Sequence, residues 1–316
     1  MRLTLRPFWR RGGQAGEGPE GPGFLDTVPV PWGGPAPAEQ AREQYERALA
    51  GLAARPADPI ALAVAIPFCA AHCLYCERDI HAAQPAEVID AYVESLLAEA
   101  RLLSQRIGAR HEVLQAHLGG GTANELSELQ LVRLVGGLQE VWRMPADAEM
   151  SVDCDPRRVT QSQLDLLRGL GFRLVSFGVA DLDPGVQQAI GRRHSHALVD
   201  DVCRVARESG FDRINLELMI GLPQQTPARW RATLERIVDM APDRVALSRY
   251  RHRPASVAVQ RALDASALPS EAEARAKEAE RAAQAKARAA AEAKQREAEA
   301  IERELEALKR KIGKQP

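Results

Sequence analysis

The chain has 316 residues, enough to bury the core of one large domain or of two ordinary ones. Its 42 lysine and arginine residues are balanced by 43 aspartate and glutamate residues, and the net charge of −1 argues against a general nucleic-acid-binding surface. Five cysteines, three of them close together, do not make a disulfide framework, so we expect a cytoplasmic protein in a reducing compartment.

Residues 1–37 are expected to form a flexible leader. The stretch from Gly12 to Pro37 is dense in glycine and proline, which cannot sustain a regular element. The basic start lacks the apolar core of a signal peptide, and no later stretch reaches the roughly 18 apolar residues of a membrane span. A helix is predicted over 38–54, where Tyr45, Leu49 and Leu52 recur at helical spacing.

From residue 60 onward, short apolar runs alternate with longer amphipathic segments. This pattern predicts repeated βα units and a parallel sheet, hence an α/β fold. The predicted strands are 60–66, 112–118, 149–154, 173–179, 214–220 and 244–250. The predicted helices between them are 86–106, 126–142, 161–170, 197–209 and 226–239. Six such units are too few for a closed eight-stranded barrel.

The first of these strands runs into a cysteine motif. Cys69, Cys73 and Cys76 form the array C-x3-C-x2-C within IPFCAAHCLYC. Thiolates at this spacing can converge on one metal centre. A closed structural zinc site uses four protein ligands, whereas three leave an open coordination position. The alternatives are a zinc knuckle completed by His72 or His81, and three unrelated thiols.

This stretch resembles the signature of the radical S-adenosylmethionine (SAM) enzymes. The resemblance implies that the three cysteines hold a [4Fe-4S] cluster, whose fourth iron binds S-adenosylmethionine. It implies that the cofactor radical abstracts a substrate hydrogen and that no protein residue does so. It also implies that Tyr75 lies against the adenine, and that residues 38–270 form a partial, TIM-like (β/α)6 barrel with an open side.

Further motifs follow the second and third strands. Gly119, Gly120, Gly121 and Thr122 resemble the family motif GGGTP, which contacts the amino group of the cofactor. Asp153, in SVDCDP, stands where the family has a cofactor-binding glutamate; a surface aspartate is the alternative. Asp155 is expected to cap the turn before Pro156.

The later strands supply the remaining candidates for cofactor binding. Arg192 aligns with a family arginine that helps to hold the cofactor, and a planar guanidinium suits a carboxylate. Glu217 stands in the place of a family aspartate, whereas Ala180 replaces a cofactor-contacting glutamine. We expect His194 and His196 to be solvated residues near a helix start rather than metal ligands.

Taken together, the segments IPFC, GGGT, VDCDPR, GLPQQTP, YRHRP and QRALDASALPS resemble the oxygen-independent coproporphyrinogen III oxidases. The resemblance implies oxidative decarboxylation of propionates to vinyl groups on a tetrapyrrole, with an electron donor such as flavodoxin or ferredoxin. A substrate with several carboxylates needs cations. The candidates are Arg193, Arg249, Arg251 and Arg253.

The chain departs from that family inside the site. Ala63 and Ala65 replace a tyrosine and a histidine, and Arg78 replaces a cysteine beyond the third ligand. Arg251 replaces a small residue. These changes leave an alternative function open, that of a cluster-containing protein that binds or transfers haem or a porphyrin without decarboxylase activity.

The C-terminal segment differs from the family as well. Where the family continues into a helical domain, residues 271–316 are nearly all Ala, Glu, Lys, Arg and Gln, which predicts a long helix. Ile301, Leu305, Leu308 and Ile312 recur as in a heptad. The segment 298–312 is therefore a candidate for self-association through a short coiled coil, with a single solvated helix as the alternative.

Overall fold

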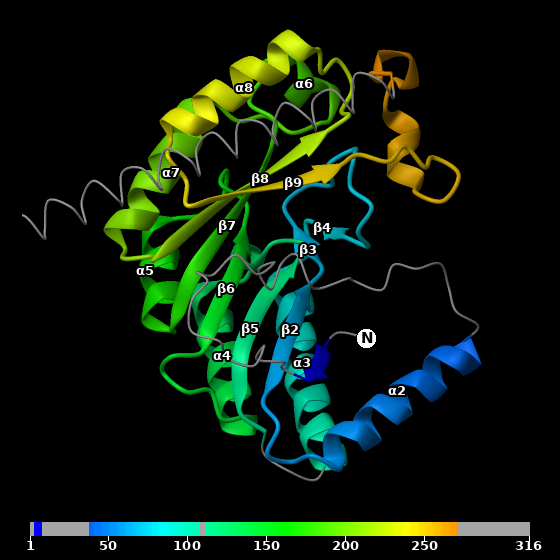
Figure 1. The fold of residues 1–316 in the computed structure, drawn as a ribbon, viewed down its shortest axis with the longest axis vertical. Helices are drawn as coiled ribbons and strands as arrows, with labels where there is room; N and C mark the ends of the chain where they lie inside the picture. Colours follow the sequence, from blue (N-terminus) through cyan, green and yellow to red (C-terminus); the bar gives the residue numbers. More distant parts are fainter. Residues whose placement is uncertain (1–2, 8–37, 108–110, 271–316) are drawn as a thin grey trace, which may run out of the picture.

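The structure is a computed structural model that describes residues 3–7, 38–107 and 111–270 (Figure 1). Its main sheet has the strand order β1-β2-β5-β6-β7-β8-β9. The strands of this sheet are β1 (Leu3–Pro7), β2 (Ile60–Ile66), β5 (Val113–Gly120), β6 (Glu149–Cys154), β7 (Phe172–Ala180), β8 (Arg213–Ile220) and β9 (Arg244–Arg249). From β2 to β9 the neighbours are parallel, as predicted.

Strand β1 corrects the prediction of a leader without regular structure over residues 1–37. It pairs antiparallel with β2, with Leu3 opposite Val64 and Pro7 opposite Ile60. The edges of the sheet are β1 and β9, which are not paired with each other. The sheet is therefore an open, partial barrel, which confirms the predicted fold class.

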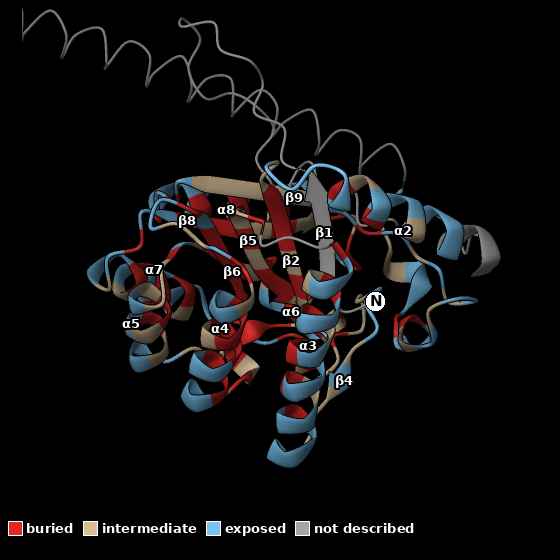
Figure 2. Cartoon of the chain, turned by 90° about the horizontal axis from the view of Figure 1, so that it is seen from below, coloured by how far each residue is buried: buried red, intermediate tan, exposed pale blue. Residues whose placement is uncertain are grey.

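The helices form a layer against one face of the sheet. Figure 2 shows α3, α4, α5 and α7 side by side beneath the strands, with their buried faces turned toward the sheet. The helices are α2 (Ala38–Ala53), α3 (Ala86–Ile107), α4 (Glu128–Val141), α5 (Gln161–Gly169), α6 (Pro184–Ala189), α7 (His196–Glu208) and α8 (Pro227–Asp239). Within the described residues, no helix has the length and apolar character needed to cross a membrane.

The ends of the helices follow from their capping residues. The helix predicted from residue 126 begins at Glu128 because the side chain of Ser127 accepts a hydrogen bond from the backbone of Gln130 in a capping box. Helix α6 was not predicted, since six residues are too few to show a helical period; Asp183 caps it and Pro184 fixes its first turn.

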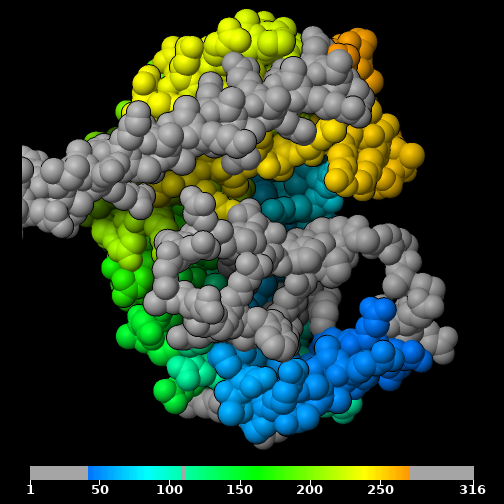
Figure 3. Space-filling view, in the orientation of Figure 1, coloured from blue at the N-terminus to red at the C-terminus, as the bar shows by residue number. Residues whose placement is uncertain are grey.

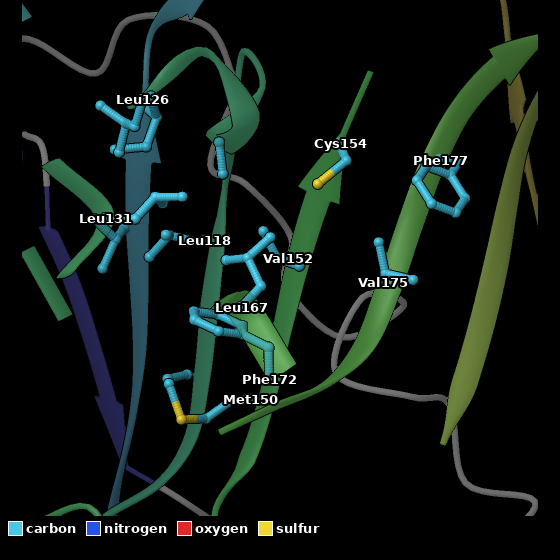
Figure 4. Packing of buried hydrophobic residues seen from close by; sticks show 14 of the residues in the cluster. Leu118, Leu126, Leu131, Met150, Val152, Cys154, Leu167, Phe172, Val175 and Phe177 are labelled. Carbon is cyan, nitrogen blue, oxygen red and sulfur yellow. The ribbon is translucent and has the colours of Figure 1, made fainter. Parts of the chain in front are cut away.

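The core lies between the sheet and the helices. Leu118, Val152, Val175 and Phe177 are buried there, and Figure 4 places Cys154 among these apolar side chains. Because successive side chains of a strand point to opposite faces, the residues between them point to the other side of the sheet. Full burial of one large apolar side chain contributes about 1.5–3 kcal/mol, so this layer fixes the register of the strands.

Short elements shape the loops at the carboxyl ends of the strands. Strand β3 (Phe68–Cys69) pairs in parallel with β4 (His81–Ala82) and closes the loop that carries the cysteines. The 3-10 helices are η1 (Ala123–Glu125), η2 (Ala258–Ala262) and η3 (Ala265–Ala267). The helix predicted over 271–316 and the candidate segment for self-association at 298–312 lie outside the described residues.

Candidate functional site

A cavity lies at the carboxyl ends of the parallel strands. Loops or final residues of β2, β5, β6, β7, β8 and β9 all contribute to its lining. The predicted site residues that line it are Cys69, Cys73, Tyr75, Cys76, Gly120, Gly121, Thr122, Asp153, Arg192 and Glu217. Gly119 and the four arginines proposed for substrate binding are not among the lining residues. Residues far apart in the sequence are thus brought to one place, as parallel βα units require.

The loop after β2 is held by backbone hydrogen bonds to the loop after β5. The N–H of Gly121 donates to the carbonyl of Ile66 at 2.6 Å, and the N–H of Thr122 donates to that of Phe68 at 3.0 Å. A Cβ atom at Gly121 would lie 2.9 Å from the Ile66 carbonyl, and Gly120 has a φ of +109°. Glycine is required at both positions because the two loops touch.

Burial opposes the ionisation of two of the cysteines that line the cavity, Cys69 and Cys76. Burial raises the pKa of Cys69 to about 12, with further contributions from Cys76 and Cys73. Burial also raises the pKa of Cys76. A metal that binds Cys69 and Cys76 must therefore displace their thiol protons, as is usual when thiolates bind metals.

The spacing of the thiols bears on the kind of metal centre. Among the described residues, no three His, Cys, Asp or Glu side chains lie close enough together to hold one metal ion. In a four-iron cluster each thiolate binds a different iron atom, so the sulfur atoms stand further apart than around a single ion. Three thiols that line one cavity are consistent with a cluster held by three cysteines.

A buried ion pair connects the end of β6 to the cysteine loop. The Nη2 atom of Arg192 lies 3.2 Å from Oδ1 of Asp155, and its Nη1 atom lies 3.5 Å from Sγ of Cys73. Burial alone would raise the pKa of Asp155, but hydrogen bonds and charge from Arg157 and Arg192 hold it below its usual range. Asp155 does cap its turn, as predicted, since Oδ1 accepts from the backbone of Arg157 at 3.0 Å.

Thr122 contributes to this connection in a way that the sequence did not predict. Its hydroxyl oxygen accepts a hydrogen bond from the backbone N–H of Asp155 at 2.9 Å and donates to the side chain of Asn124. The partners of this hydroxyl therefore belong to the protein. Thr122 lines the cavity, but its side chain positions the end of β6.

A second group of charged residues lies on the inner side of the sheet. It consists of Arg78, His117, Asp153 and Glu217, and we call it the charged quartet. Nε2 of His117 lies 3.4 Å from Oδ2 of Asp153, and Arg78 donates to the carbonyl of Gly120. The strand register explains the grouping, since His117 stands opposite Ser151, and Glu217 opposite Gly178.

The carboxylates of the charged quartet have opposite pKa shifts. Burial would raise the pKa of Asp153, but His117 and Arg78 outweigh it and lower the pKa. For Glu217, burial and the nearby charge of Asp153 raise the pKa to about 7. Two carboxyl groups at one wall of a cavity thus hold their protons in different pH ranges.

Two members of the charged quartet were not predicted from the sequence to be site residues. His117 was not singled out, although strand alternation places it on the same side as Gly119, two residues later. Arg78 was noted only as a replacement for a cysteine. Its contact with the carbonyl of Gly120 is between residues 42 apart in sequence, which no local pattern predicts.

The remaining candidates lie outside the cavity. Arg193, Arg249, Arg251 and Arg253 are exposed. His194 was expected to be solvated, and this is wrong: it is half-buried, its Nε2 lies 3.1 Å from the carbonyl of Val179, and burial lowers its pKa. His196 is exposed at the start of α7, as expected.

The segment after β9 packs against the cysteine loop. Nε2 of Gln260 donates to the carbonyl of Tyr75 at 3.3 Å, and Oε1 of Gln260 accepts from the N–H of Arg253 at 2.5 Å. Tyr75 also packs against the apolar cluster that contains Tyr250 and Leu263. In Figure 3 the cyan atoms of the cysteine-loop region lie against the yellow and orange atoms of this segment. Residues after 250 therefore support Tyr75 at the wall of the cavity.

Comparison with known proteins gives matches for the same part of the chain. The model of the radical SAM superfamily matches residues 64–237, more than half of the chain. The oxygen-independent coproporphyrinogen III oxidase of Salmonella typhimurium is 36% identical over 230 residues, which are 72% of this chain and 50% of that protein. The corresponding protein of Helicobacter pylori is 36% identical over 67% of this chain and 47% of its own length.

A solved structure agrees with these matches. The chain is similar to the coproporphyrinogen III oxidase of Escherichia coli, with a TM-score of 0.71 and 34% identity. The similarity covers 75% of this chain and 55% of that structure. The chain spans about half the length of the curated relatives it matches.

Proposed function

The chain belongs to the radical SAM superfamily, and from this premise we propose that it is an oxidoreductase that decarboxylates propionate side chains of a tetrapyrrole. The resemblance found in the sequence is thereby confirmed at the level of the family. Family membership implies a [4Fe-4S] cluster and S-adenosylmethionine as cofactors. The reaction is proposed from the relatives named coproporphyrinogen III oxidase.

The residues of the cavity fit these cofactors. Cys69, Cys73 and Cys76 would hold the cluster, because they are the thiols that line the cavity beside Arg192. Two buried polar atoms near them, Oδ1 of Asp153 and Nε of Arg192, have no hydrogen-bond partner among the described residues. A buried polar group without a partner is costly, so such atoms in a cavity indicate a ligand with complementary groups.

Each remaining residue would have a positional role. Together the bound cofactors supply one-electron chemistry that removes a hydrogen atom from the substrate. Tyr75 would lie against the adenine, and Gly120 and Gly121, which line the cavity, would contact the amino group of the cofactor. Asp153 and Glu217 would accept hydrogen bonds from the amino group or the ribose. The convergence of the three thiols and these carboxylates on one cavity is the observation that carries the proposal.

The carboxylates of the substrate would be bound by arginines that do not line the cavity. Arg193, Arg249, Arg251 and Arg253 are exposed, and guanidinium groups are suited to the propionates of a tetrapyrrole. An electron donor such as flavodoxin or ferredoxin would reduce the cluster. All five cysteines are free thiols, which supports a reducing, cytoplasmic location.

Electron paramagnetic resonance (EPR) tests the cofactor part of this proposal. The protein is reconstituted anaerobically with iron and sulfide, reduced with dithionite, and measured with and without S-adenosylmethionine. We expect a [4Fe-4S]+ signal that changes on addition of S-adenosylmethionine. Cys73→Ala should lose the signal, whereas Cys203→Ala, which removes a buried thiol on α7, should keep it. A wild-type signal unaffected by S-adenosylmethionine would contradict the proposal.

A second candidate function is supported by the wall of the cavity at β7. Ala180 lines the cavity at a φ of +65° and offers no hydrogen-bonding side chain to a ligand. This favours a protein that keeps the cluster but binds haem or a porphyrin without decarboxylating it. Incubation with coproporphyrinogen III and S-adenosylmethionine separates the two functions: 5′-deoxyadenosine and vinyl products support the enzyme, and stoichiometric haem binding without either product supports the binding protein.

A further inference from the structure

His117 lies beside the proposed cofactor site, and the proposed function gives it no role. It is on β5, two residues before Gly119, and its side chain is 14% exposed. Nδ1 lies 2.9 Å from Oγ of Ser151, and Nε2 lies 3.4 Å from Oδ2 of Asp153. The ring is therefore held from both sides by residues of β6.

The contact with Asp153 determines which ring nitrogen carries a proton. A carboxylate oxygen can only accept, so Nε2 of His117 must be protonated to face Oδ2. The other carboxylate oxygen, Oδ1, is buried and has no hydrogen-bond partner among the described residues. Asp153 itself is only 8% exposed and lines the cavity. His117 thus occupies one oxygen of Asp153, while the other remains for a ligand.

The contact between His117 and Asp153 explains why residue 119 is a glycine. A Cβ atom at residue 119 would lie 2.6 Å from Oδ2 of Asp153 and would clash with Nε2 of His117. Gly119 does not line the cavity. The glycine therefore makes room for the contact between His117 and Asp153, rather than for a ligand.

We propose that His117 is a positioning residue of the cofactor site, which holds Asp153 as a carboxylate with Oδ1 presented to the ammonium or ribose hydroxyls of the ligand. This inference rests on the proposed binding of S-adenosylmethionine. His117 acts through Asp153, and Ser151 orients the imidazole ring.

The charges around the pair support this role. The charged groups that face Asp153 and His117 are Glu217 on β8 and Arg78 on the cysteine loop, and the Ser176 side chain on β7 also hydrogen-bonds to the Asp153 carboxylate. Burial lowers the pKa of His117, but the Asp153 carboxylate outweighs burial and raises it. The imidazole is thereby kept cationic to higher pH, and in turn it keeps Asp153 ionised to lower pH. Removal of the imidazole would raise the pKa of Asp153, because burial would then be opposed only by Arg78 and by the hydrogen bond from the Ser176 side chain.

The test compares variants of His117 at two pH values. S-adenosylmethionine affinity is measured by titration of the EPR change in the reconstituted protein at pH 8 and pH 6. His117→Ala should weaken binding about tenfold at pH 8, because the Asp153 carboxylate loses its orientation. The loss should be larger at pH 6 than at pH 8, because the pKa of Asp153 is higher without the imidazole. His117→Gln retains an N–H donor but no charge, so it should restore affinity at pH 8 and not at pH 6.

Controls separate positioning from a general structural effect. His196→Ala, at the exposed start of α7, should leave affinity unchanged at both pH values. In an Asp153→Asn background, His117→Ala should cost no further affinity, since its effect acts through Asp153. Wild-type affinity of His117→Ala at both pH values, with normal cluster content, would overturn this inference alone. A wild-type protein that does not bind S-adenosylmethionine would overturn the proposed function and this inference with it.

Discussion

Asp153 on β6 and Asp181, which follows β7, are both buried carboxylates, but their surroundings differ. Asp181 is fully buried and accepts hydrogen bonds from Thr233 at 2.6 Å, from Gln225 at 2.7 Å and from the backbone N–H of Asp183 at 2.8 Å. Asp153 has one buried oxygen without such a partner and lines the cavity. The first carboxylate therefore serves the fold, whereas the second is left open toward a ligand.

The network of Asp181 nevertheless lies next to the site. Asp181 directly follows Ala180, where the pairing of β7 with β8 shifts register and φ is +65°. Gln225 connects the same carboxylate to the loop after β8, because its side chain also accepts from the N–H of Gly221 at 2.8 Å. The closed network thus holds two strand ends in place, and the cavity depends on both.

The largest effect on stability is expected from Asp181→Ala. The change removes the acceptor of three hydrogen bonds, two of them buried, at a cost of about 2–5 kcal/mol in the free energy of unfolding. Urea denaturation followed by circular dichroism measures it. Thr233→Val removes one donor together with its hydrogen bond and should cost about 1 kcal/mol. If Asp181→Ala cost no more than Thr233→Val, the network would not support the fold as described.

Asp153→Asn should show the opposite of Asp181→Ala, a loss of ligand affinity with little loss of stability. The amide keeps the shape of the side chain but not its charge, so S-adenosylmethionine should bind about tenfold or more weakly at pH 8. The free energy of unfolding should change by less than about 1 kcal/mol, because a hydrogen-bonding partner for His117 is retained. Titration of the EPR change and urea denaturation give the two values. A large loss of stability with unchanged affinity would assign Asp153 to the fold instead.

Glu217→Gln tests the pKa of the second carboxyl group in the cavity. Its pKa rises from an ordinary 4.5 to about 7, so Glu217 takes up a proton on folding between these values. Its contribution to stability is complete below pH 4.5 and is lost as the pH rises through 7. Relative to Glu217→Gln, the wild-type protein should become less stable from pH 5 to pH 7.5.

Urea denaturation at several pH values measures that difference. Asp153 provides the contrast, because its lowered pKa gives a contribution that is present above its ordinary value of 3.8 and is lost at lower pH. A difference between wild type and Glu217→Gln that is constant from pH 5 to pH 7.5 would contradict the raised pKa.

The sequence predicted the strands well because their apolar runs are long and their ends are marked by glycine and proline. The cysteines, Asp153, Arg192 and Glu217 were found through motifs of a known family. Strand β1 was missed because its partner in the sheet, β2, is more than 50 residues away, so that its pairing is not a local property.

The charged contacts of the site were harder to predict for a related reason. The pairing of His117 with Asp153 depends on strand register and on the absence of a side chain at Gly119. Arg192 was expected from a motif, yet its contact with Asp155 joins residues 37 apart in sequence. Such pairs follow from the packed sheet, whereas a sequence pattern indicates only that each residue is present.

We expect the smallest effect from Ala180→Gln. This substitution tests whether the hydrogen-bond network of Asp181 influences the cofactor site. The residue at 180 already adopts a positive φ, and the bonds of Asp181 hold the adjacent backbone, so a longer side chain adds little backbone strain beyond that of alanine. Because Ala180 lines the cavity, the glutamine amide can reach a bound ligand. One added hydrogen bond should raise the affinity for S-adenosylmethionine about threefold. The gain should vanish when Thr233→Val loosens the carboxylate of Asp181; a gain that persists there would show that the two regions act independently.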